Sequence, residues 1–160
     1  GSSFRVTKVK TKEQIQPALE AAFKESDDVM IEAFMDGIEL ANGCYKTHDK
    51  SVVFPITEVV SKNEFFDFNA KYKPARLSPE LTQRVQQLTS AIYDILDCKG
   101  IVRVDYIITE GDKINMLEIN TTPGMTATSF IPQQVRAAGL DIKDVMTDII
   151  EDELKNRKTK

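Results

Sequence analysis

Hydrophobic residues recur at helical spacing in four stretches of the chain, and each apolar stripe is expected to pack against the rest of the molecule. Thr11 begins the first stretch, where Gln14 completes a capping box. Ser78 begins the second as an N-cap, with Pro79 at the first helical position, and Gly100 is the expected stop. The other two expected helices span 129–138 and 141–157.

Alternating and β-branched runs between these stretches predict strands. Asp36-Gly37 and His48-Asp49 are turn signals that make the second, third and fourth strands an antiparallel meander. Residues 61–77 have little periodicity and are expected to form a long, poorly ordered loop. The order β-α-β-β-β-loop-α-β-β-α-α predicts an α+β domain with helices packed on a mostly antiparallel sheet. The expected strands are 4–10, 29–34, 38–45, 51–60, 101–109 and 114–119.

Composition narrows the functional classes only slightly. The chain has 160 residues, which is one domain's length, and 41% of them are hydrophobic, which is too many for a disordered protein. A net charge of −4 gives no support to nucleic-acid or membrane-surface binding. Cys44 and Cys98 have no metal-site spacing, and no secretory leader opens the chain, so a cytoplasmic location is expected.

The last two expected strands form a hairpin that carries the candidate chemistry. If its tip lies at 111–112, Asp105 lies opposite Glu118, and Arg103 lies opposite Asn120 one step further along. Facing carboxylates repel unless a partner neutralises them, and an all-oxygen donor set suits Mg²⁺ rather than zinc. The alternative is a solvated face where screening tolerates the pair. The other face, expected in the core, holds Val102, Val104, Tyr106, Ile108, Leu117 and Ile119.

A polar, turn-rich segment over 120–126 connects this hairpin to the next helix. Gly124 permits close backbone approach to a ligand, and Ser129 stands where it would cap the helix, whose free N–H groups favour an anion. Together with a cation site, these features indicate an enzyme that acts on phosphate and carboxylate groups. In the alternative interpretation, Ser129 caps the helix and binds no ligand.

Two motifs closely resemble the signature of the D-alanine–D-alanine ligases of the ATP-grasp superfamily: the Arg-Val-Asp of 103–105 and the Leu-Glu-Ile-Asn-Thr-Thr-Pro-Gly-Met-Thr of 117–126. Residues 1–9 are similar to the family's phosphate-covering loop, 31–40 to its adenine and ribose segment, and 70–72 to the start of its substrate loop. The resemblance implies that 1–160 is the C-terminal ATP-grasp part of such a ligase. The N-terminal domain and the first ATP-grasp strands are absent from this sequence.

The resemblance also implies how metal and nucleotide would be held. Two Mg²⁺ ions, with Mn²⁺ as a substitute, would share Glu118 as a bridging ligand. The implied metal ligands are Asp105, Glu118 and Asn120. The implied ATP contacts are Ser2 and Ser3 at the phosphates, Glu32 and Met35 at the adenine, and Glu39, otherwise an ordinary strand residue, at the ribose.

In the implied reaction, ATP phosphorylates the carboxylate of one D-alanine, and the amine of a second D-alanine attacks the acyl phosphate. The dipeptide serves peptidoglycan synthesis and therefore cell shape. Arg103 and the backbone of Gly124 would stabilise the tetrahedral intermediate, and Ser129 would hold the acceptor's carboxylate. The implied residues of the substrate loop are Lys71 and Tyr72.

Three further expectations concern the chain as given. Family members are commonly homodimers, yet this truncated chain alone is expected to be inactive. One alternative function is an incompetent domain that retains weak Mg²⁺ or nucleotide binding. The other is a ligase that joins D-alanine to D-lactate or D-serine. Tyr72 resembles the residue of the dipeptide-forming ligases and favours that type instead.

Overall fold

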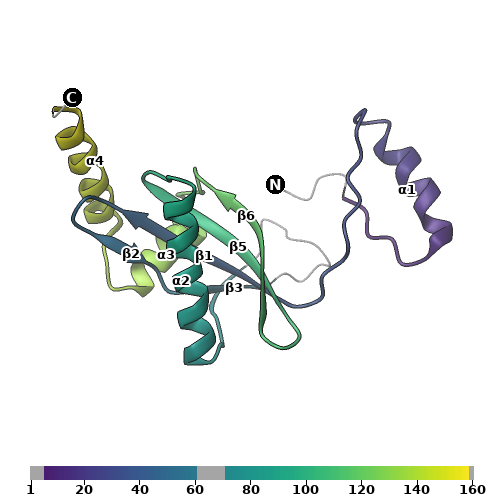
Figure 1. The fold of residues 1–160 in the computed structure, drawn as a ribbon, viewed down its shortest axis with the longest axis horizontal. Coiled ribbons are helices and arrows are strands. Elements are labelled where there is room, and N and C mark those ends of the chain that lie inside the picture. The colour runs from purple at the N-terminus through teal and green to yellow at the C-terminus, as the bar shows by residue number, and fades with distance from the viewer. Residues whose placement is uncertain (1–5, 61–70, 159–160) are drawn as a thin grey trace. The chain divides into compact units, whose positions relative to one another are not determined.

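The computed structural model describes residues 6–60 and 71–158, and they fall into two compact units (Figure 1). Unit 1 comprises residues 1–36 and 61–70, and unit 2 comprises residues 37–60 and 71–160. Each unit is described by itself below. Within the described ranges, no helix has both the length and the apolar character needed to cross a membrane.

The described part of unit 1 contains one helical segment, the 3-10 turn η1 (Lys12–Gln14) that continues into α1 (Ile15–Ala22). The predicted capping box is present, because Gln14 Oε1 accepts the backbone N–H of Thr11 at 3.4 Å. No residue of α1 is buried, so the packed face expected for this helix is not found.

The strands predicted over 4–10 and 29–34 are wrong for the residues that the structure describes. Residues 6–10 and 29–34 form no strand, and residues 4 and 5 lie outside the described part. A β-branched run becomes a strand only when a neighbouring strand pairs with its backbone. Unit 1 supplies no such neighbour among its described residues, so Asp36-Gly37 does not close a hairpin.

Unit 2 is built on a six-stranded sheet in the order β4-β3-β1-β5-β6, with β2 pairing beside β3 along the same edge of β1. All of its strand pairs are antiparallel, which confirms the predicted α+β class. The strands are β1 (Ile38–Lys46), β2 (Ser51–Val53), β3 (Thr57–Val60), β4 (Lys71–Pro74), β5 (Ile101–Thr109) and β6 (Lys113–Asn120). The helices are α2 (Pro79–Ile95), α3 (Phe130–Ala137) and α4 (Ile142–Lys158).

Two sequence expectations between β1 and α2 need correction. The single strand predicted over 51–60 is two strands, because Pro55 lies in the break between β2 and β3 and cannot donate a ladder hydrogen bond. The loop predicted over 61–77 contains β4, which pairs with β3. Residues 61–70 of that loop lie outside the described residues.

Helix α2 begins as predicted and ends earlier than predicted. Ser78 Oγ accepts the backbone N–H of Leu81 at 3.1 Å, and Pro79 follows the cap. Asp97 adopts a left-handed conformation with φ of 46° and reverses the chain before Gly100 is reached.

The helices of unit 2 cover both faces of the sheet, so the core has two main parts. Leu81 and Val85 of α2 pack against Leu40, Val104 and Tyr106 on one face. On the other face, α3 and α4 pack against the neighbouring positions of the same strands. The buried residues of this second cluster are Tyr45, Phe54, Ile101, Ile131, Val135 and Val145.

The β5–β6 hairpin has the predicted register near the candidate site and a β-bulge in its middle. Asp105 pairs with Glu118, whereas Tyr106 pairs with Met116, so Leu117 is the extra residue. Leu117 was predicted to be in the core, but its side chain is 44% exposed because the bulge interrupts the alternation of faces. The other predicted core positions of the hairpin are buried or half-buried.

Candidate functional site

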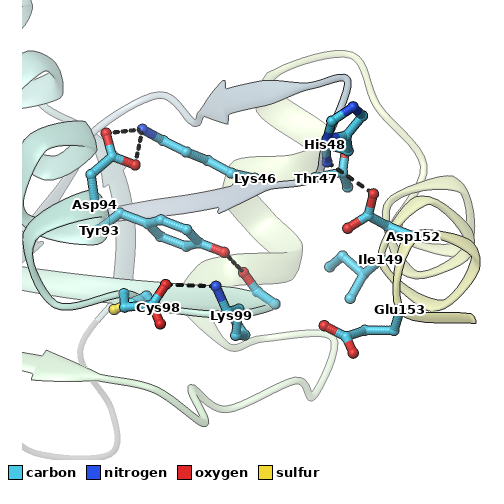
Figure 2. Close-up of a pocket in the computed structure, with 12 residues that line it drawn as sticks. Lys46, Thr47, His48, Tyr93, Asp94, Cys98, Lys99, Ile149, Asp152 and Glu153 are labelled. Atoms are coloured by element: carbon cyan, nitrogen blue, oxygen red, sulfur yellow. Dashed lines mark hydrogen bonds and ion pairs between the residues drawn. The ribbon is translucent and has the colours of Figure 1, made fainter. Parts of the chain in front are cut away.

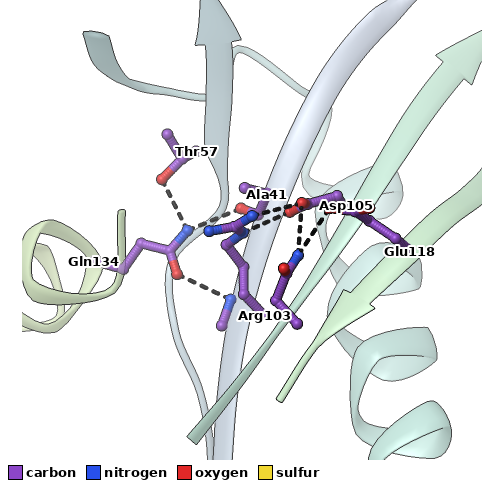
Figure 3. A network of polar contacts seen from close by, with 8 residues as sticks. Ala41, Thr57, Arg103, Asp105, Glu118 and Gln134 are labelled. Atoms are coloured by element: carbon purple, nitrogen blue, oxygen red, sulfur yellow. Dashed lines mark hydrogen bonds and ion pairs between the residues drawn. The ribbon is translucent and has the colours of Figure 1, made fainter. Parts of the chain in front are cut away.

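The predicted pairing of two carboxylates is present on the face of the β5–β6 hairpin that α3 and α4 cover. Asn120 Nδ2 donates to Asp105 Oδ2 at 3.1 Å and to Glu118 Oε1 at 3.0 Å, so one amide spans both carboxylates (Figure 3). Arg103 donates from two guanidinium nitrogens to the two oxygens of Asp105, each at 2.7 Å. The four side chains therefore form one connected polar cluster.

The electrostatics of this cluster differ between its carboxylates. Burial raises the pKa of Asp105, although the Arg103 guanidinium opposes that shift, and both side chains are less than one-fifth exposed. The hydrogen bond from Asn120 lowers the pKa of Glu118. Glu39 on β1 has a raised pKa because of burial and, secondarily, the charge of Asp105. Two facing carboxylates thus lie beside Arg103, and Glu39 is close enough for its pKa to respond to the charge of Asp105.

A divalent cation would neutralise the facing carboxylates, and the donor set suits such an ion chemically. Two carboxylates and an amide carbonyl are oxygen donors of the type that Mg²⁺ prefers. Asn120 points its NH₂ group at the carboxylates, and a half-turn of the amide would present its oxygen instead. Within the described residues, no three His, Cys, Asp or Glu side chains are grouped to hold a metal. The oxygen donors that this hairpin brings together are two carboxylates and one amide.

The segment between β6 and α3 places Gly124 and Ser129 next to each other. A Cβ on Gly124 would lie 2.9 Å from Ser129 Oγ, so a larger residue at 124 would displace that hydroxyl. Ser129 is the N-cap of α3 by its backbone conformation, but its side chain makes no capping hydrogen bond. Its hydroxyl instead lies 2.8 Å from Thr126 Oγ1, which corrects the interpretation of Ser129 as a side-chain cap.

The remaining predicted site residues are distributed as follows. Glu32 and Met35 belong to unit 1, where both are exposed, whereas Glu39 belongs to unit 2. Lys71 and Tyr72 lie in β4, and their backbones pair with Val60 and Val59. Only the backbone of these two β4 residues is described. Ser2 and Ser3 lie outside the described residues.

Sequence reasoning missed two residues of α3 that reach this region. The Phe130 ring centroid lies 5.5 Å from the Arg103 guanidinium carbon, which is cation–π range. Gln134 is fully buried and hydrogen-bonds to β1 and β3. The signal available in the sequence was a glutamine within the apolar stripe of Phe130, Ile131 and Val135.

A cavity of about 370 Å³ lies elsewhere in unit 2, between the β1–β2 turn, the end of α2 and α4 (Figure 2). Ion pairs occupy its charged lining, with Lys46 2.7 Å from Asp94 and Lys99 2.7 Å from Asp97. None of the predicted site residues lines it. The acidic hairpin is therefore the better candidate for the functional site.

Comparison with known proteins identifies what the chain resembles. The family model described as the D-ala D-ala ligase C-terminus matches residues 1–151. D-alanine–D-alanine ligase from Bacteroides fragilis is 76% identical over 158 residues, which cover 94% of this chain and 49% of that protein. The chain thus spans about half the length of the curated relatives it matches.

Solved structures agree with this match. The VanG D-Ala:D-Ser ligase from Enterococcus faecalis has a TM-score of 0.79 and 32% identity, covering 94% of this chain and 46% of its own. A D-alanine–D-alanine ligase from Bacillus anthracis, complexed with ATP, has a TM-score of 0.74 and 29% identity, covering 95% and 49%. With the acidic hairpin and the Gly124 segment in place, these matches show that the chain belongs to the D-alanine–D-alanine ligase family and corresponds to its C-terminal part.

Proposed function

We propose that this chain is the catalytic C-terminal half of a ligase that joins two D-alanine molecules at the expense of ATP. The observation that carries the proposal is the cluster of Arg103, Asp105, Glu118 and Asn120 on one face of one hairpin. Relatives that are 50–76% identical to the chain are named D-alanine–D-alanine ligases. One structural neighbour was solved with ATP, which supports ATP as the nucleotide.

The acidic residues of the hairpin would hold Mg²⁺ ions during phosphoryl transfer. Asp105 and Glu118 would supply the charged oxygens and Asn120 its carbonyl oxygen, with Glu118 shared between two ions. Mg²⁺ held there, or Mn²⁺ in its place, would supply the positive charge that neutralises phosphate oxygens in phosphoryl transfer. The raised pKa of Asp105 supports this role, because a buried acid beside a second carboxylate gains from a cation partner.

Arg103 and the Gly124 segment would act in the second half of the reaction. The Arg103 guanidinium is fixed by two hydrogen bonds to Asp105 and by the ring of Phe130, so its remaining N–H groups have a defined direction. A fixed donor stabilises developing oxyanion charge without reorganisation when the amine attacks the acyl phosphate. Ser129, held beside Gly124, would bind the carboxylate of the acceptor D-alanine.

The remaining assignments extend the proposal to the nucleotide and the substrate loop. The proposed adenine contacts are Glu32 and Met35, the ribose contact is Glu39, the phosphate-loop residues are Ser2 and Ser3, and the substrate-loop residues are Lys71 and Tyr72. The enzyme would act in the cytoplasm as a homodimer and supply D-alanyl-D-alanine for peptidoglycan and cell shape. An acceptor other than D-alanine is less favoured, because the D-Ala:D-Ser ligase neighbour is 32% identical and the D-alanine–D-alanine ligases reach 76%.

A chimera tests the proposal directly. This chain replaces the C-terminal half of the Bacteroides fragilis ligase, and the purified chimera receives ATP, Mg²⁺ and D-alanine. We expect phosphate release coupled one-to-one to D-alanyl-D-alanine. With D-alanine and D-serine at equal concentrations, we expect the dipeptide of D-alanine to predominate. No dipeptide from a folded chimera, or a mixed product with D-serine in excess, would refute the proposal.

A further inference from the structure

Strand β1 has a gap on the edge that β2 and β3 share. β3 pairs with Leu40 and Ala41, and β2 pairs with the segment that starts at Cys44. The chain between β2 and β3 passes this gap at 54–56, where one backbone bond, from Phe54 N–H to Gly43 O at 2.9 Å, is made. The carbonyl of Ala41 and the N–H of Gly43 consequently need partners from elsewhere.

Gln134 of α3 supplies both partners. Its Oε1 accepts the Gly43 N–H at 2.9 Å, and its Nε2 donates to the Ala41 carbonyl at 2.8 Å (Figure 3). Nε2 also donates to Thr57 Oγ1 on β3 at 2.9 Å. Both side chains are fully buried. The glutamine amide thus makes the two hydrogen bonds to β1 that a neighbouring strand would otherwise make.

The two β1 residues that Gln134 holds are the ones that pair with the site on the opposite edge. Ala41 pairs with Asp105, and Gly43 pairs with Arg103. Only glycine allows α3 to approach so closely, because a Cβ at Gly43 would lie 2.7 Å from Gln134 Oε1. Gln134 therefore joins α3 to the part of β1 that pairs with Arg103 and Asp105.

Helix α3 contacts the cluster itself one turn before Gln134. Phe130 precedes Gln134 by four residues, so both lie on the same face of the helix, and its ring packs at Arg103. Ser129 and the Gly124 segment lead into this first turn. A shift of α3 along β1 would therefore move the ring behind Arg103 and the Ser129 hydroxyl together.

We propose that Gln134 is a positioning residue of the ligase. It fixes α3 against β1 and thereby sets the direction of Arg103 and the place of the acceptor-binding segment around Ser129. The inference rests on the proposed function for its consequence in catalysis. Gln134 itself touches no substrate, so its effect should fall on the attack of the acceptor amine more than on the binding of ATP.

The test uses the chimera with three variants. Gln134→Met keeps the length and shape of the side chain and removes all three hydrogen bonds. Gln134→Glu keeps an acceptor for Gly43 and, when its buried carboxyl is protonated, one donor. Val145→Ala, in the cluster between α3 and α4, is the control that loses stability without losing a bond to β1.

We expect Gln134→Met to lower kcat/KM for the acceptor D-alanine at least ten-fold while KM for ATP changes less than two-fold. Gln134→Glu should recover part of this loss, and more of it at pH 6 than at pH 9. Hydrogen exchange should quicken over 121–129 in Gln134→Met and stay unchanged in Val145→Ala. If Gln134→Met does not fold, Gln134→Glu and its pH profile decide the matter.

The inference is overturned if the Gln134 variants keep wild-type constants and exchange, or if Val145→Ala produces the same kinetic pattern at an equal loss of thermal stability. An inactive wild-type chimera would instead refute the proposed function. In that case, hydrogen exchange over 121–129 still tests the positioning role, because the exchange measurement requires no turnover.

Discussion

The properties of the candidate site depend on a few charged side chains that lie close together. Arg103 donates two hydrogen bonds to Asp105, while Glu39 and Glu118 add negative charge nearby. Removing one partner of a partly buried pair leaves an uncompensated charge, which costs far more than the pair contributes. Arg103 therefore stabilises the folded chain as well as serving the proposed chemistry.

We expect Arg103→Met to lower the free energy of unfolding of the 160-residue chain by about 2–3 kcal/mol at neutral pH. Arg103 lowers the pKa of Asp105, so its removal lets burial raise that pKa further in the folded state. A carboxyl whose pKa is raised by folding destabilises the fold as pH rises through the raised value. The loss should therefore shrink towards about pH 4, as urea unfolding in a chelating buffer would show.

The matched control for this pH effect is the double variant Arg103→Met with Asp105→Asn, which has no acid to titrate at that place. Its loss of stability should change little with pH. A loss in Arg103→Met that is the same at both ends of the pH range would contradict the electrostatic description of the pair.

At the scale of elements, the β5–β6 hairpin combines a predictable register with an unpredictable bulge. Alternation of apolar and polar positions predicted the strands, and a tip placed at 111–112 predicted the pairing of Asp105 with Glu118. Next to the turn the structure pairs Thr109 with Lys113, one residue away from that register, and the bulge restores the predicted pairing at Asp105. The bulge at Leu117 was not predictable, because leucine continues the apolar pattern and no local signal marks an extra residue. The bulge turns Leu117 outward while keeping the two carboxylates opposite each other.

This geometry predicts different costs for two truncations in the same hairpin. Leu117→Ala should change the free energy of unfolding by less than about 1 kcal/mol, because much of the side chain is already in water. Val104→Ala should cost about 2 kcal/mol, because Val104 is fully buried and leaves a cavity. Chemical denaturation of both variants measures the difference, and equal losses would place Leu117 in the core after all.

Other elements show where local patterns are insufficient. Ser78 and Pro79 predicted the start of α2 because a helix cap is a local interaction. The run over 29–34 has strand propensity but no described strand beside it, and strand formation depends on that distant partner. Gln134 could not be assigned from the sequence, because its partner Gly43 lies 91 positions away.

At the scale of the whole molecule, the chain corresponds to half of its relatives, and the proposed reaction needs more than this half. The 117–126 motif is specific enough to indicate the family from the sequence, and with it the location of the candidate site. Acyl phosphate and amine must be held in attack geometry, a contribution worth about 7–11 kcal/mol in well-oriented systems. The chain covers 49% of the length of its Bacteroides fragilis relative, so about half of that ligase has no counterpart among these 160 residues.

We therefore expect the 160-residue chain alone to form no measurable D-alanyl-D-alanine at saturating ATP and Mg²⁺. Chromatographic detection of the dipeptide against the chimera as a positive control would test this. Weak Mg²⁺ binding by the isolated chain is compatible with the expectation, because both carboxylates come from one hairpin. Steady dipeptide formation by the chain alone would show that the acidic hairpin and its neighbours suffice for catalysis.

The most direct test of the central claim compares two glutamates of the same hairpin in the chimera. Glu118→Gln removes the proposed bridging ligand and should lower kcat for D-alanyl-D-alanine formation by about 100-fold or more. Glu110→Gln, at the exposed turn between β5 and β6, makes the same change of charge and should leave kcat within about two-fold of the wild type. Wild-type kcat in Glu118→Gln would contradict the assignment of the acidic hairpin as the catalytic metal site.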